Sequence, residues 1–175
     1  SRLRVALLEQ RHGELLDRAG TVTNLGEFDP ATLGFRGSFA GGTLVGDYIL
    51  SNLVSRLNSI YSAAGLDVVF STNSSDFEFE PFSTVYLTST VDTLAPIFDT
   101  FTSLNSVFLG GGFFSTQPYG FSQHSDAFNT DLTDEAVVFV PSFALLGLSP
   151  SQDDADVLVQ SLTAAVGRRV GELVG

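Results

Sequence analysis

Residues 149–175 read SPSQDDADVLVQSLTAAVGRRVGELVG and carry the pattern of an amphipathic helix. Ser149 or Ser151 can cap its start, because a serine hydroxyl accepts a hydrogen bond from the backbone of the first helical turn. Acidic residues suit the positive N-terminal end of a helix, and here these are Asp153, Asp154 and Asp156. We predict that this helix runs to the end of the chain. Its apolar stripe consists of Leu158, Leu162, Ala165, Val166 and Leu173.

The segments before this helix alternate between helical and strand patterns. Residues 135–140 (EAVVFV) form an apolar run bounded by acids and Pro141, which predicts a buried strand. Residues 66–71 and 83–88 read as two further strands. Residues 44–64 have apolar side chains at helical spacing and stop at Gly65, so we predict a long helix there.

The remaining segments give weaker patterns. Residues 1–20 are rich in helix formers, and we expect an N-terminal helical extension over 1–18 that Gly20 ends. A short strand is expected over 33–39. The alternation of acids with Phe77 and Phe79 suggests an edge strand near 76–80, and residues 91–123 read as a Gly/Phe-rich insertion.

The composition indicates one domain with an unusually low charge content. The chain has 175 residues, of which 43% are hydrophobic and 16% charged, and its mean hydropathy is +0.24. Its apolar runs are far shorter than the roughly 18 residues that a membrane-spanning helix needs. We therefore expect no transmembrane segment, and the apolar excess favours a large interface in addition to the core.

The net charge restricts the classes of partner. Twenty acids against eight arginines give a formal charge of −12, which disfavours nucleic acids and anionic membranes. Calcium or a basic partner fits better, although the acids can also serve solubility alone. No cysteine is present, so disulfides and thiolate metal sites are excluded. The start at Ser1 suggests a processed or truncated N-terminus, and we expect a secreted, periplasmic or cell-surface protein.

Two stretches carry a resemblance to a known family. Residues 120–139 read GFSQHSDAFNTDLTDEAVVF, a glycine, an Asp/Asn cluster and a buried strand just before the last helix. Residues 168–175 read RRVGELVG. Together they resemble the matrixin-like domains of bacterial surface proteins, which are metzincin zinc peptidases, and the resemblance covers roughly residues 44–175. It implies a small twisted mixed sheet with a long backing helix and a C-terminal helix in the position of the active-site helix.

The residues that the family needs for catalysis are missing from that helix. Metzincins carry His-Glu-x-x-His-x-x-Gly there, and the aligned positions hold Arg168 and Glu172 for the histidines and Arg169 for the glutamate. Gly175 falls at the family glycine. An arginine has no lone pair for zinc and cannot act as a base at neutral pH. The resemblance therefore implies a degenerate peptidase without a zinc site or a catalytic residue.

The substituted residues suggest a structural replacement. Arg168 and Glu172 are four residues apart and can pair along the helix. Arg169 falls on the apolar stripe, where a charge needs a partner or an exit to solvent. A structural ion pair, contact with a partner protein and simple exposure near the chain end all remain open for Arg169.

Other residues form candidate binding sites. Hard oxygen ligands for calcium are offered by Asp126, Asn129, Asp131 and Asp134, although such residues also favour ordinary turns. The two histidines, His12 and His124, are distant in sequence and more typical of structural or exposed positions. A group of phenylalanines in the loop-rich middle reads as an extra core layer or a docking surface: Phe98, Phe101, Phe108, Phe113, Phe114, Phe121 and Phe128.

These features together predict an α/β domain with a non-catalytic role. The preferred function is a secreted or cell-surface structural or interaction subunit on a degenerate peptidase fold, with protein partners that include other copies of the chain. A metallopeptidase-related enzyme with unusual ligands, or with a motif continuing beyond Gly175, is the first alternative. A calcium-dependent adhesion module is the second, and no other cofactor is expected.

Overall fold

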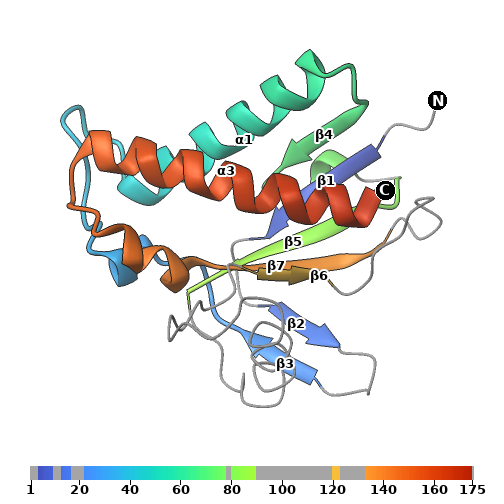
Figure 1. Ribbon diagram of the computed structural model, residues 1–175, viewed down its shortest axis with the longest axis horizontal. Coiled ribbons are helices and arrows are strands. Elements are labelled where there is room, and N and C mark those ends of the chain that lie inside the picture. Colours follow the sequence, from blue (N-terminus) through green and yellow to red (C-terminus); the bar gives the residue numbers. More distant parts are fainter. Residues whose placement is uncertain are drawn as a thin grey trace, which may run out of the picture.

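The protein is a mixed α/β domain in which two long helices cover one face of a twisted sheet (Figure 1). The computed structural model describes residues 4–9, 13–16, 22–77, 80–89, 120–122 and 133–174. In this part of the chain, no helix is both long and apolar enough to cross a membrane.

The main sheet has five strands in the order β4-β1-β5-β7-β6. Four of them run parallel, and β6 pairs antiparallel with β7 at one edge. The sheet is therefore mixed, as predicted. Its strands, in sequence order, are β1 (Arg4–Glu9), β4 (Val68–Ser71), β5 (Ser83–Thr88), β6 (Gly120–Ser122) and β7 (Glu135–Phe139).

Two long helices pack against each other over the same face of the sheet (Figure 1). The first, α1 (Val45–Ala63), buries Ile49, Leu53 and Leu57 completely. The second, α3 (Gln152–Val174), follows β7 after the short 3₁₀ helix η3 (Val140–Leu146). The predicted helices over 44–64 and at the C-terminus are both confirmed, because apolar periodicity reports directly on the buried face.

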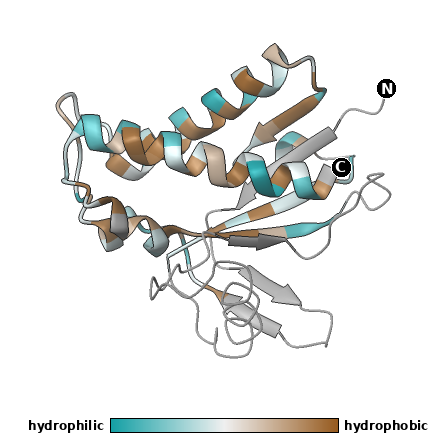
Figure 2. Cartoon of the chain, in the orientation of Figure 1, coloured by the Kyte–Doolittle hydropathy of each residue, from teal (hydrophilic) through white to brown (hydrophobic). Residues whose placement is uncertain are grey.

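Strand β7 is buried on both faces of the sheet. Ala136 and Val138 join the core beneath the two helices, whereas Val137 and Phe139 pack with Leu25 in a second cluster. Since neighbouring side chains of a strand point to opposite faces, these two clusters lie on opposite sides of the sheet. A strand that is covered on both sides needs a continuous apolar run, which residues 136–140 provide. Brown and teal residues alternate along α1 and α3 in Figure 2, as expected for helices with one buried face.

The N-terminal region differs from the sequence-based expectation. The predicted helix over 1–18 is wrong, because Arg4–Glu9 is strand β1 and Gly13–Leu16 is strand β2. Strand β1 pairs with β4 on one side and β5 on the other, and these ladders override local helix propensity. Strand β2 pairs antiparallel with β3 (Val22–Leu25) in a separate small sheet.

Two short predicted strands do not form among the described residues. No strand forms over 33–39, where Ser38 makes only an isolated bridge with Leu44. The preceding η1 (Pro30–Leu33) is capped by the Asp29 carboxylate, which accepts from the Ala31 backbone at 2.9 Å. At 76–77 the predicted edge strand is absent, because Ser74–Phe77 forms η2 and Phe77 is buried, while residues 78 and 79 lie outside the described part of the chain. The insertion predicted over 91–123 lies outside the described residues, except for β6.

Candidate functional site

The candidate site lies near the C-terminal end of α3, and the helix start fixes its register. The Ser151 hydroxyl accepts from the Asp154 backbone at 3.1 Å, which identifies Ser151 as the cap. The Asp154 carboxylate in turn accepts from the Ser149 backbone at 2.7 Å. The side chain of Ser149 lowers the pKa of Asp154 below its ordinary value, and the Ser149 backbone and the Ser151 side chain act in the same direction.

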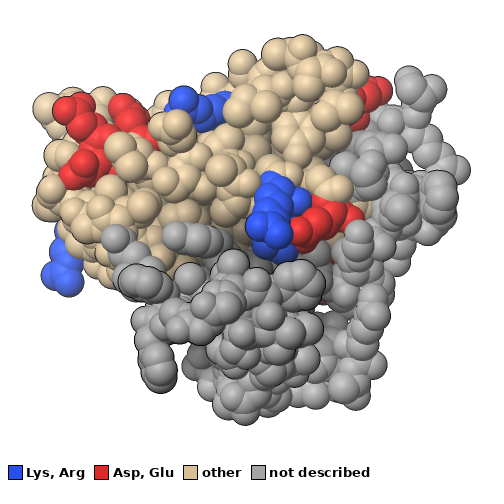
Figure 3. All heavy atoms as spheres, viewed as in Figure 1, with Lys and Arg blue, Asp and Glu red and all other residues tan. Residues whose placement is uncertain are grey.

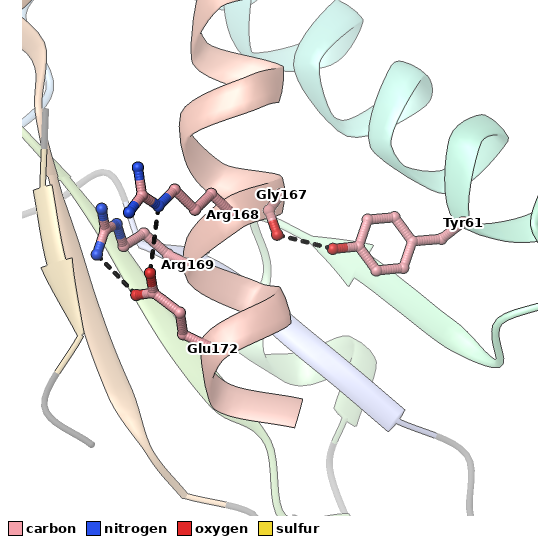
Figure 4. A network of polar contacts seen from close by, with 5 residues as sticks. All are labelled: Tyr61, Gly167, Arg168, Arg169 and Glu172. Carbon is pink, nitrogen blue, oxygen red and sulfur yellow. Dashed lines mark hydrogen bonds and ion pairs between the residues drawn. The ribbon is translucent and has the colours of Figure 1, made fainter. Parts of the chain in front are cut away.

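Contact with α1 fixes the rotation of α3 about its axis. The Tyr61 hydroxyl, at the end of α1, donates to the backbone carbonyl of Gly167 at 3.0 Å. The adjoining face of α3 is buried, including Leu162, Val166 and Val170. As a result, Arg168, Arg169 and Glu172 project from the side of the helix away from Tyr61 (Figure 4).

These three side chains form one ion cluster, here called the arginine cluster (Arg168, Arg169 and Glu172). Arg168 Nε lies 3.3 Å from Glu172 Oε1, and Arg169 Nη1 lies 2.7 Å from Glu172 Oε2. The predicted pair between Arg168 and Glu172 is confirmed. The sequence left the partner of Arg169 open, and the structure shows an ion pair with the same carboxylate.

The two arginines occupy different environments. The Arg168 side chain is 74% exposed, whereas that of Arg169 is only 14% exposed. Burial lowers the pKa of Arg169, and the neighbouring Glu172 carboxylate opposes that effect. The guanidinium still carries its charge at neutral pH, because arginine is effectively always protonated there. Glu172 therefore stabilises a positive charge that is largely removed from water.

This geometry determines what the cluster can bind. Each carboxylate oxygen of Glu172 already contacts a guanidinium, and neither guanidinium offers a lone pair to a metal. The cluster thus lacks the donor set of a zinc site. The guanidinium groups are instead suited to bind anions, especially carboxylates, which match their planar array of N–H donors.

The predicted calcium ligands fall mostly outside the described residues. Asp126, Asn129 and Asp131 lie there, as do both histidines. Asp134 is described and is 2% exposed, and its backbone carbonyl accepts from Thr84 at 2.9 Å at the start of β7. Within the described ranges, no three His, Cys, Asp or Glu residues gather as metal ligands. The calcium site stays a prediction.

The predicted phenylalanine surface likewise falls mostly outside the described residues. The backbone of Phe121 belongs to β6. The other six residues lie outside the described part of the chain, namely Phe98, Phe101, Phe108, Phe113, Phe114 and Phe128. Their role as core layer or docking surface stays open.

The side-chain hydrogen bonds that join α1 to α3 and to β4 were not predicted from the sequence. Tyr48 at the start of α1 donates to Asp156 of α3 at 2.6 Å. Asn58 of α1 bonds both backbone groups of Phe70 in β4, at 3.0 Å to the carbonyl and 2.9 Å from the amide. The partners are distant in sequence and match no local motif, so the sequence carries no signal for them.

Comparison of the chain with protein-family models, with curated proteins and with solved structures finds no match.

Proposed function

We propose that this protein is a non-catalytic interaction subunit built on a metzincin-like fold whose zinc site has been replaced by ion pairs. The observation that carries the proposal is the arginine cluster. At the positions where the family resemblance expects two zinc-binding histidines and a catalytic glutamate, the side chains bind one another. They stabilise the helix, and they supply neither a metal ligand set nor a general base.

The order of elements supports the family part of this proposal. The resemblance implies a backing helix, two strands, a loop, a further strand and a last helix. The chain has α1, β4, β5, β7 and α3 in that order, with a mixed sheet behind them. The arginine cluster lies near the C-terminal end of α3, at the aligned motif.

The composition supports the proposal that the protein acts by binding other proteins. A low charged content of 16% together with sixteen phenylalanines makes the chain more apolar than a solvated monomer of this size needs to be, so we infer protein partners, among them other copies of the chain. We further propose a secreted, periplasmic or cell-surface location, in keeping with the surface proteins that the chain resembles.

Metal analysis of the purified protein tests the non-catalytic role. We expect less than stoichiometric zinc by mass spectrometry and no peptidase activity on unstructured substrates after zinc addition. A protein that retains one zinc per chain through dialysis, or that cleaves peptides in a chelator-sensitive manner, would overturn the proposal.

A restoration variant tests whether the arginine cluster occupies a former metal position. Combining Arg168→His, Arg169→Glu and Glu172→His recreates the two-histidine motif on α3. The matched control is Gln160→His with Ala164→His, an equally spaced pair on the exposed face of the same helix. We expect the restoration variant to bind cobalt at least about tenfold more tightly than the control, since the fold would add ligands that an exposed pair lacks. Equal affinities would contradict the metzincin-like placement.

A further inference from the structure

The arginine cluster carries a surplus of positive charge in a strongly acidic protein. Two guanidiniums and one carboxylate leave one positive charge, whereas the whole chain has a formal charge of −12. Arg168 uses its Nε on Glu172, and its side chain is 74% exposed. Because a guanidinium has five N–H donors, Arg168 has further donors facing solvent that can bind a carboxylate.

Acidic side chains gather at the N-terminal ends of α1 and α3, at the other end of α3 from the arginine cluster. We call this surface the acidic end, and it consists of Asp47, Asp153, Asp154 and Asp156. The helices α1 and α3 begin side by side, as the hydrogen bond from Tyr48 to Asp156 shows. Asp47 and Asp153 are both exposed. Figure 3 shows acidic side chains at the end of the molecule where α3 begins, and the mixed basic and acidic group toward its other end.

The two charged surfaces cannot meet within one molecule. Asp153 and Arg168 stand on the same helix, and at 1.5 Å per residue the fifteen steps between them span about 22 Å. A helix that is packed along its length against a sheet does not bend back on itself. Contact between these opposite charges therefore requires a second molecule.

We propose that the arginine cluster of one copy binds the acidic end of a second copy, so that copies of the chain associate head to tail. This association rests on the proposed function as an interaction subunit, and it identifies the partner as a second copy of the chain. The interface joins two different surfaces, so a bound pair of copies still has one free arginine cluster and one free acidic end. Such a contact builds rings or open filaments instead of closed dimers. Because it depends on exposed charges, added salt weakens it.

Sedimentation velocity on the full chain tests the proposal. We expect concentration-dependent association at about 20 mM NaCl that is largely lost at about 500 mM, as the screening length falls. Arg168→Glu and Asp153→Arg should each weaken association at least about tenfold, since each places like charges across the contact. The matched controls Arg56→Glu and Asp67→Arg change exposed charges elsewhere and should associate like the wild type.

Mixing the two interface variants gives a signature specific to head-to-tail contact. In an equimolar mixture, the glutamate introduced in one variant meets the arginine introduced in the other, and the native surfaces that remain also pair. Association should therefore return in the mixture although each variant alone associates at least about tenfold more weakly than the wild type. Circular dichroism confirms that both variants are folded.

Three results would overturn the proposal: a wild-type protein that is monomeric at low salt, variants that associate like the wild type, or a mixture that stays monomeric. None of these bears on the zinc and peptidase measurements. The head-to-tail contact can thus fail while the non-catalytic role stands, and the reverse also holds.

Discussion

At the scale of single residues, Glu172 has the largest electrostatic role in the arginine cluster, because its one carboxylate pairs with both guanidiniums. We expect Glu172→Gln to lower the free energy of unfolding by about 1–2 kcal/mol, since Arg169 then loses its counterion while only 14% of its side chain is exposed. Arg168→Gln removes a pair whose arginine is 74% exposed and should cost less than about 0.5 kcal/mol. Urea unfolding measures both, and equal losses would show that Arg169 does not depend on Glu172.

Tyr61 gives a prediction about alkaline pH. Burial raises the pKa of Tyr61 above its ordinary value of 10.0. A raised pKa means that the folded state holds the proton more tightly, so this stabilisation is complete below pH 10 and is lost as pH rises through the folded pKa. Tyr61→Phe should cost about 1 kcal/mol at neutral pH by removing the bond to Gly167. It should also flatten the alkaline fall in melting temperature, and an unchanged slope would contradict this assignment.

At the scale of elements, the same glycine-to-alanine substitution can be compared at two positions, one within α3 and one just after α1. A Cβ added at either Gly171 or Gly65 would meet no atom within 4 Å, but Gly65 has a φ of +71°. Gly171→Ala should stabilise the protein by about 0.5–1 kcal/mol, because alanine favours the helix. Gly65→Ala should destabilise it by about 1 kcal/mol, because the left-handed conformation is strained for alanine. Thermal unfolding measures the change in stability of both variants. Changes of the same sign would refute the explanation from backbone conformation.

The edge of the sheet gives a second element-scale prediction. Asn58 bonds the amide and carbonyl of Phe70, so it occupies backbone groups of the edge strand β4 that would otherwise be open to another strand. Asn58→Ala should cost about 1–3 kcal/mol and should speed aggregation, followed by thioflavin fluorescence. Asn52→Ala is the control, because the bond that Asn52 makes among the described residues is to a carbonyl of its own helix, that of Tyr48. Equal aggregation of the two variants would contradict a protective role for Asn58.

The sequence predicted those elements whose burial leaves a periodic pattern. The helix over 44–64 and the strands over 66–71, 83–88 and 135–140 are all present. The pair between Arg168 and Glu172 was also predictable, because it needs only helical spacing. The N-terminal strands could not be predicted from the sequence, because β1 is stabilised by partners more than sixty residues away in the chain. Local propensity favoured a helix there, and non-local pairing prevailed over it.

At the scale of the whole molecule, the net charge of −12 predicts a stabilising effect of salt. Like charges repel each other more in the compact state than in the unfolded chain, and ions screen that repulsion. We expect the melting temperature to rise by several degrees between about 20 and 300 mM NaCl. Calorimetry on the Arg168→Glu variant separates this effect from association. A melting temperature that falls with salt would mean that ion pairs dominate over repulsion.

The position of β1 between two strands that come later in the chain has a consequence for synthesis on the ribosome. Strand β1 is synthesised before both of its neighbours, Val68–Ser71 and Ser83–Thr88. At roughly 5–20 residues per second, β1 waits several seconds before its first partner emerges. During that interval α1 can form alone, because its hydrogen bonds are local. The nascent chain thus passes through a stage in which a helix is complete while an interior strand of the future sheet remains unpaired and open to chaperones.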